Sequence, residues 1–69
     1  MILGNYTGTY IGKEIFGFQK GHKYQFELNN NGRTYELNAF QDITDGISKD
    51  LHNIYASEIS IRRNWNLDE

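Results

Sequence analysis

The residues best suited to chemistry lie near the C-terminus, where Arg62 and Arg63 directly precede Asn64 and Trp65. Arginine beside an exposed aromatic ring can hold phosphate and stack on bases, as small barrels that bind single-stranded nucleic acid do. The same residue types are enriched at the centres of protein–protein interfaces. A third interpretation places Trp65 in the core and leaves the arginines solvated. We favour it over nucleic-acid binding because the net charge is −2.

Other side chains extend these binding hypotheses. Lys20, Lys23 and Arg33 can enlarge a basic patch. Tyr6 and Tyr10 belong to a lightly charged segment with strand periodicity, and an open strand edge can be extended by a partner or by a second copy. The residues predicted to bind a partner are therefore Arg62, Arg63, Trp65, Tyr6, Tyr10, Lys20, Lys23 and Arg33.

The sequence offers no arrangement typical of catalysis or metal binding. His22 and His52 are far apart in the chain, and the absence of cysteine excludes a thiolate zinc site. The serines lack a nucleophile elbow, and Asp42, Asp45 and Asp50 are typical of turns and helix caps. A domain of this size also has little room for a deep pocket. We therefore predict a non-enzymatic protein without a metal or cofactor.

Length and composition predict one small β domain, residues 1–69, with a single core. Ten aromatic residues and eight isoleucines supply this core, and there are only two alanines, which favours a small barrel over a helical bundle. No apolar run approaches the ~20 residues needed to cross a bilayer. The N-terminus also lacks the pattern of a signal peptide. We therefore expect a cytoplasmic protein with no membrane partner.

The first half of the chain has strand periodicity. Residues 5–11 alternate Tyr and Gly with Thr and Ile, and Gly8 among them indicates a bulge, a bend or the close approach of another backbone. A loop over residues 12–14 follows. The aromatic pair Phe16 and Phe18 then leads into a turn in which Gly21 suits a positive φ angle.

Residues 23–40 predict a β-hairpin, because strict alternation continues on both sides of an asparagine-rich turn. One strand has a polar face with Gln25 and Glu27, and its partner has Glu36 and Asn38 in the same role. The apolar faces are formed by Tyr24, Phe26 and Leu28 on the first strand and by Tyr35, Leu37 and Ala39 on the second.

Two hairpin registers keep these apolar faces together, since a shift of two residues preserves facing. A two-residue turn at positions 31–32 would place Glu27 opposite Glu36, which is unfavourable for like charges. A four-residue loop over positions 29–32 would place Glu27 opposite Thr34. We favour the longer loop on grounds of charge.

Residues 47–64 allow two interpretations. An amphipathic helix is indicated by the spacing i, i+4, i+7, i+8 of Ile47, Leu51, Ile54 and Tyr55, but residues 53–56 equally fit a short strand. Downstream, the alternation of isoleucines fits a strand, whereas a helical turn capped by Ser57 would place two apolar residues at i, i+4. We leave both alternatives open.

The order of residues 16–28, Phe-Gly-Phe-Gln-Lys-Gly-His-Lys-Tyr-Gln-Phe-Glu-Leu, resembles the diverging turn and following strand of SH3-like domains. A polar loop and a strand follow, and residues 54–59 resemble the SH3 segment in which a strand runs into a 3₁₀ turn. The likeness covers residues 15–61. The chain is also similar to short SH3-like proteins of phages and prophages, some of which end in a comparable Tyr-x-Ser … Asn-Trp pattern.

The chain departs from SH3 domains that bind proline-rich peptides. Arg33 and Thr34 stand where those domains carry a Trp pair, Ala56 stands where they carry Pro, and their acidic loop is reduced to Glu14. Binding of PxxP peptides is therefore not expected, because that recognition requires an aromatic-lined groove.

These observations predict a mainly β, SH3-like barrel of about five strands, with a central hairpin at residues 23–40 and one short helix or 3₁₀ turn within residues 47–64. The expected function is a non-enzymatic protein-binding module, either monomeric or homodimeric. The resemblance, together with frequent Asn, Ile and Tyr and no Val or Pro, suggests a phage or prophage accessory protein that binds or inhibits a host factor. The alternatives are a nucleic-acid-binding barrel and a subunit of a larger assembly.

Overall fold

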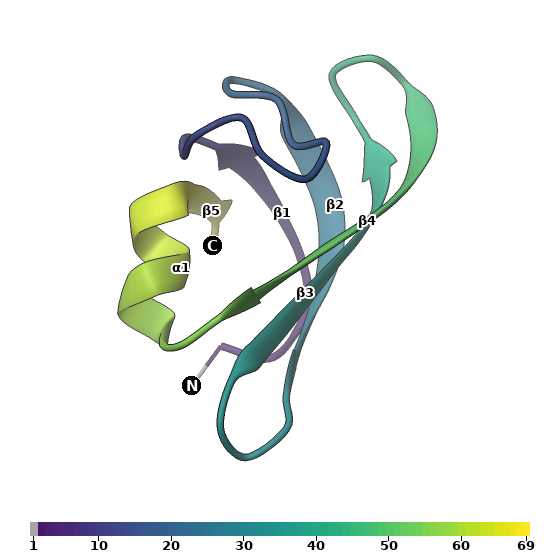
Figure 1. Cartoon of the computed structure of the whole chain (residues 1–69). Coiled ribbons are helices and arrows are strands. Elements are labelled where there is room, and N and C mark those ends of the chain that lie inside the picture. The colour runs from purple at the N-terminus through teal and green to yellow at the C-terminus, as the bar shows by residue number, and fades with distance from the viewer. Residues whose placement is uncertain (1) are drawn as a thin grey trace.

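The computed structural model describes residues 2–69 and shows a mainly β chain with five antiparallel strands and one short helix (Figure 1). The elements are β1 (Gly4–Tyr10), β2 (Lys23–Asn30), β3 (Tyr35–Asp42), β4 (Ile47–Tyr55), α1 (Glu58–Asn64) and β5 (Trp65–Asp68). Across residues 2–69, no helix is long and apolar enough to cross a bilayer.

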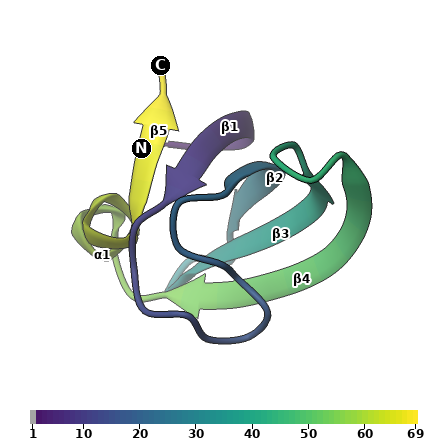
Figure 2. The ribbon, with the colours of Figure 1, turned by 90° about the horizontal axis from the view of Figure 1, so that it is seen from above.

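The five strands form one curved sheet in the order β4-β3-β2-β1-β5, and α1 connects its two edge strands (Figure 2). β1 is internal, because it pairs with β2 on one side and with β5 on the other, where Tyr10 is opposite Trp65. The prediction that the strand of Tyr6 and Tyr10 presents an open edge is therefore wrong. The C-terminal strand β5, which was not predicted, pairs with that edge.

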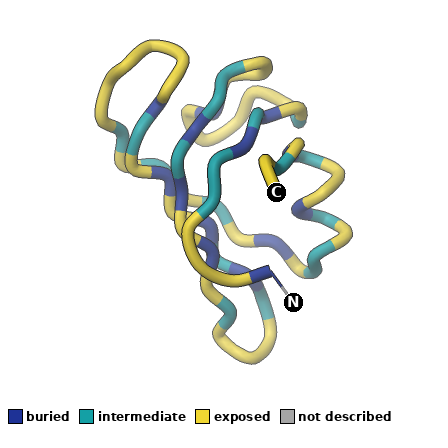
Figure 3. The backbone as a smooth tube through the Cα atoms, turned by 180° about the vertical axis from the view of Figure 1, so that it is seen from behind, coloured by how far each residue is buried: buried dark blue, intermediate teal, exposed yellow. Residues whose placement is uncertain are grey.

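The core is an aromatic cluster on the inner face of the sheet, where the buried positions of the strands gather (Figure 3). The Trp65 ring lies at its centre, with ring centroids 5.0 Å from Tyr10, 5.4 Å from Phe18, 5.7 Å from Tyr24 and 4.7 Å from Phe26. Mixed edge-on and tilted geometries of this kind are favoured for aromatic pairs. The interpretation of Trp65 as a core residue is confirmed.

The predicted central hairpin is confirmed as β2 and β3, but both predicted registers are wrong. Leu28 is opposite Leu37 and Glu27 is opposite Asn38, so the loop occupies residues 31–34. The side chain of Asn31 fixes this loop by accepting hydrogen bonds from the backbone N–H groups of residues 33 and 34 at 3.0 and 2.9 Å. The observed register differs from both predictions by an even number of residues, so the apolar faces still coincide.

The two alternatives for residues 47–64 are resolved separately. Residues 47–55 form β4, so the helical interpretation of Ile47, Leu51 and Ile54 is wrong. The helix lies after it: Ser57 caps α1 by accepting a 3.2 Å hydrogen bond from the N–H of Ser60. This cap matches the predicted one, and the short helix falls within the predicted range.

Candidate functional site

Phe16 is the most exposed of the large apolar side chains that the structure describes. It lies in the loop between β1 and β2, is 67% exposed, and is the only non-glycine residue among those described with a positive φ angle, 55°. This left-handed conformation is unfavourable for a bulky residue and is found mostly where surrounding structure enforces it. Phe18, two residues later, is only 1% exposed. The aromatic pair of the sequence is thus divided between core and surface.

Contact with β4 holds this loop in place. Gly17, with φ 85°, packs so closely on Leu51 that a Cβ built at this glycine would lie 2.7 Å from Leu51 Cδ2. A hydrogen bond of 3.0 Å from the N–H of Phe18 to the carbonyl of Ile15 closes the turn around Phe16. The loop therefore presents Phe16 from a braced position against β4.

A groove of about 460 Å³ lies beside this contact, lined by Phe16 of the loop and by residues of β4. Its volume is within the range of small-molecule and peptide sites. We call it the β4-edge groove, and its lining residues are Phe16, Asp50, Leu51, His52, Asn53 and Ile54.

The strand beside this groove is an edge of the sheet. Among the described strands β4 pairs only with β3. The backbone N–H of Ile54 donates a 2.8 Å hydrogen bond to Oδ1 of the adjacent Asn53 side chain. Ile54 itself is 62% exposed. The groove thus combines exposed apolar groups with the backbone of an edge strand. This combination was not predicted, because the open edge was expected at the strand of Tyr6 and Tyr10.

The C-terminal cluster predicted to bind a partner is largely occupied by internal contacts. Trp65 is buried, and its Nε1–H donates to the hydroxyl of Tyr55 at 2.9 Å. Arg62 forms ion pairs with Glu58 at 3.1 Å and with Glu69 at 2.7 Å. Only Arg63 of this cluster is exposed without a hydrogen bond or ion pair to another described residue. The indole is not available for stacking on a base.

The remaining predicted residues do not gather at one surface. Lys23 forms a 2.8 Å ion pair with Asp68, and Lys20 lies in the β1–β2 loop. Arg33 belongs to the β2–β3 loop. Tyr10 is fully buried, and Tyr6 is partly buried and stacks on Phe26. The structure therefore does not join the eight predicted residues into a single site.

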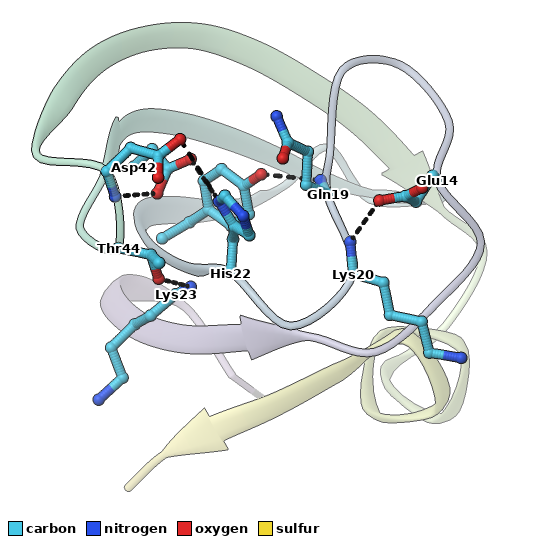
Figure 4. A network of polar contacts seen from close by, with 9 residues as sticks. Glu14, Gln19, Lys20, His22, Lys23, Asp42 and Thr44 are labelled. Carbon is cyan, nitrogen blue, oxygen red and sulfur yellow. Dashed lines mark hydrogen bonds and ion pairs between the residues drawn. The ribbon is translucent and has the colours of Figure 1, made fainter.

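One polar cluster was not predicted. His22, just before β2, donates a 2.9 Å hydrogen bond from Nδ1–H to Oδ2 of Asp42 at the end of β3, and Asp45 lies 3.8 Å from the same nitrogen. Figure 4 shows this network beside the β1–β2 loop. The contact joins residues 20 positions apart, so no local spacing in the sequence indicates it.

The electrostatics of this cluster are those of a partly buried ion pair, because Asp42 is covered and His22 is partly exposed. The hydrogen bond with Asp42 raises the pKa of His22 above 6.5. Burial opposes ionisation of Asp42, but its hydrogen bonds with His22 and with backbone N–H groups, including that of Asp45 at 3.1 Å, lower its pKa below 3.8. Asp42 is fully buried.

The three side chains of this cluster place one possible ligand atom each within 4.8 Å of one another, a spacing that would suit a metal ion. Both carboxylate oxygens of Asp42, however, already accept hydrogen bonds, from His22 and from the N–H of Asp45. This arrangement anchors the β3–β4 turn to the start of β2, and we assign the cluster a structural role.

No protein-family model, curated protein or solved structure matches this chain.

Proposed function

We propose that this protein is a non-enzymatic protein-binding module that captures its partner at the β4-edge groove. The observation that carries the proposal is the exposed Phe16 ring, held outward by a backbone conformation that is unfavourable for phenylalanine. Strained residues cluster at functional sites, and contiguous exposed apolar groups mark interaction surfaces. Ile54 on the facing strand adds to the exposed apolar area.

We further propose that the curved sheet closes as an SH3-like barrel. The strand order, with β1 between β2 and β5, supports this assignment, as does the short helix that links β4 to β5. A rigid scaffold of this type carries its binding residues on loops, which is where Phe16 lies. The target, in this proposal, is a host factor engaged by a phage or prophage accessory protein, an idea supported by resemblance and residue usage alone.

Binding of nucleic acid finds less support than binding of protein. The aromatic ring intended for base stacking, Trp65, is buried, and the cations of Lys23 and Arg62 are paired with carboxylates. A barrel that binds single-stranded nucleic acid needs an exposed aromatic ring for base stacking next to unpaired cations. The described surface instead offers exposed apolar rings and branched side chains.

The test is affinity capture with three tagged proteins: the natural sequence, Phe16→Ser and Ile59→Ser. Ile59 lies on α1, outside the groove lining, and is 65% exposed, so its substitution is a matched removal of exposed apolar surface. We expect the natural protein and Ile59→Ser to retain the same protein partner and Phe16→Ser to lose it. Equal retention by Phe16→Ser overturns the proposal. Micromolar binding of single-stranded DNA or RNA that weakens steeply with salt would also overturn it.

A further inference from the structure

We infer that the part of the partner bound in the β4-edge groove is an extended segment of alternating basic and apolar residues, which adds to β4 as a further antiparallel or parallel strand. The inference rests on the proposed function and gives its partner a chemical description. Three properties of β4 carry it: its unpaired edge, the alternation of its side chains, and the charge of its exposed alternate residues. We call these residues, Asp50, His52 and Ile54, the outward row.

The edge supplies the backbone groups for strand addition. β4 is nine residues long, and among the described strands only β3 pairs with it. The N–H of Ile54 is satisfied by the side-chain amide oxygen of Asn53, which an incoming carbonyl can replace. Main-chain hydrogen bonds of this kind provide affinity in complexes formed by strand addition, and pockets for alternate side chains provide specificity.

The apolar positions of the segment follow from the partly buried alternate residues of β4, which we call the inward row. Lys49, Leu51 and Asn53 are partly buried, whereas Asp50, His52 and Ile54 are exposed, as expected for alternate residues of a strand. The braced loop lies on Leu51, and Phe16 forms a wall of the groove. Inward side chains of an added strand would therefore contact the rings and methyl groups of Phe16 and Leu51, which favours apolar residues there.

The basic positions follow from the outward row and its neighbours. Asp50 has no ion-pair partner among residues 2–69, and Glu36 of β3 is opposite Ile54. β3 contains no Lys or Arg, and the single cation of β4, Lys49, belongs to the inward row. Outward side chains of an added strand would lie next to the uncompensated carboxylate of Asp50, with that of Glu36 one strand further in, and opposite-charge pairs across strands are favourable.

The same charges argue against a second copy as the occupant. Two copies could pair through their β4 strands to form one continuous sheet with the exposed faces on the same side. Asp50 and Glu36 of both copies would then lie on that shared face. Like charges on neighbouring strands are destabilising. A basic segment removes this repulsion, and a copy of this chain adds to it.

The test uses blocked synthetic peptides as probes: a short peptide of alternating lysine and valine, the same peptide with glutamate for lysine, and the lysine peptide with a central proline. Backbone NMR of the full chain should show shifts confined to Phe16 and residues 49–54 with the first peptide. Amide exchange at Asp50, His52 and Ile54 should slow by about tenfold, because those N–H groups enter a sheet. The proline peptide should lose this protection.

Charge reversal separates the inference from the function on which it rests. Asp50→Lys should weaken binding of the lysine peptide by about tenfold, and Asp68→Lys, on the opposite edge, should leave it unchanged. Equal binding of the glutamate peptide, or shifts away from β4, overturns the inference even where Phe16-dependent capture succeeds. Concentration-dependent dimers that protect the same β4 amides without peptide would assign the edge to a second copy and overturn it as well.

Discussion

The indole Nε1–H of Trp65 donates a 2.9 Å hydrogen bond to the hydroxyl of Tyr55 inside the core. Tyr55 is the last residue of β4 and Trp65 is the first residue of β5, so the bond joins the two edge strands where α1 connects them. Both side chains are buried, and a buried indole N–H requires a partner. This hydrogen bond therefore connects β4 and β5, which lie at opposite ends of the strand order.

Replacing Tyr55 by Phe should leave this N–H without an acceptor. We expect the free energy of unfolding to fall by about 1–3 kcal/mol, the cost of an unsatisfied buried donor. Urea denaturation followed by the fluorescence of Trp65 measures it. Tyr35, directly opposite Tyr55 and also buried, makes no hydrogen bond through its hydroxyl within residues 2–69, so Tyr35→Phe is the matched control. An equal loss in both variants would contradict the assigned role of the bond.

The His22–Asp42 pair predicts how stability changes with pH. The pKa of His22 is raised in the folded protein, so its contribution is complete below about pH 6.5 and is lost as the pH rises through the raised value. The pKa of Asp42 is lowered, so its contribution is present above 3.8 and is lost as the pH falls through the lowered value. The pair therefore stabilises the fold most in mildly acidic solution.

Urea denaturation at a series of pH values tests this linkage. We expect the natural protein to lose stability as the pH rises above about 6.5, and His22→Gln to lose most of that dependence. His52→Gln removes the other histidine, which has no hydrogen bond to Asp42, and is the matched control. Identical slopes in the natural protein and His22→Gln would show that the ion pair does not govern this range.

The features that could be predicted from the sequence depend on short-range pattern. Alternation identified the apolar faces of Phe26 and Leu28, and the Ser57 cap precedes an apolar helical face. The hairpin register could not be predicted, because it depends on how the Asn31 side chain bonds the loop backbone. β5 was missed because a four-residue strand has little pattern, and its pairing with β1 spans almost the whole chain.

The candidate site was beyond sequence reasoning for similar reasons. Phe16 and Phe18 are the same residue type two positions apart, so the pattern does not distinguish them. In the structure Phe16 has a positive φ angle and an exposed ring, whereas Phe18 lies in the core. The arginines beside Trp65 suggested a surface cluster, but the ring is needed for the core and Arg62 for ion pairs. In each of these cases, contacts between residues distant in the sequence determine whether a side chain is buried or exposed.

Gly8 provides a test of how tightly β5 covers β1. A Cβ at this position would lie 3.1 Å from the carbonyl oxygen of Asn66 and 3.3 Å from side-chain atoms of Leu67 and Phe26. We expect Gly8→Ala to lower the free energy of unfolding by about 1–3 kcal/mol through overpacking. Thermal or urea denaturation measures the loss. Thr9→Ala, one residue along the same strand, should cost much less, and a neutral Gly8→Ala would show that β5 is loosely attached.

Phe16 should show a conflict between stability and binding. Asparagine adopts the left-handed conformation more readily than phenylalanine, and Phe16 is mostly exposed, so Phe16→Asn gives up little burial. We expect this variant to be more stable in urea denaturation by about 0.5–1 kcal/mol while it fails to capture the partner of the natural protein. Ile15→Asn, at the neighbouring exposed position without a positive φ angle, should gain no stability. A destabilised Phe16→Asn would indicate that the ring supports the fold and is not held outward for a partner.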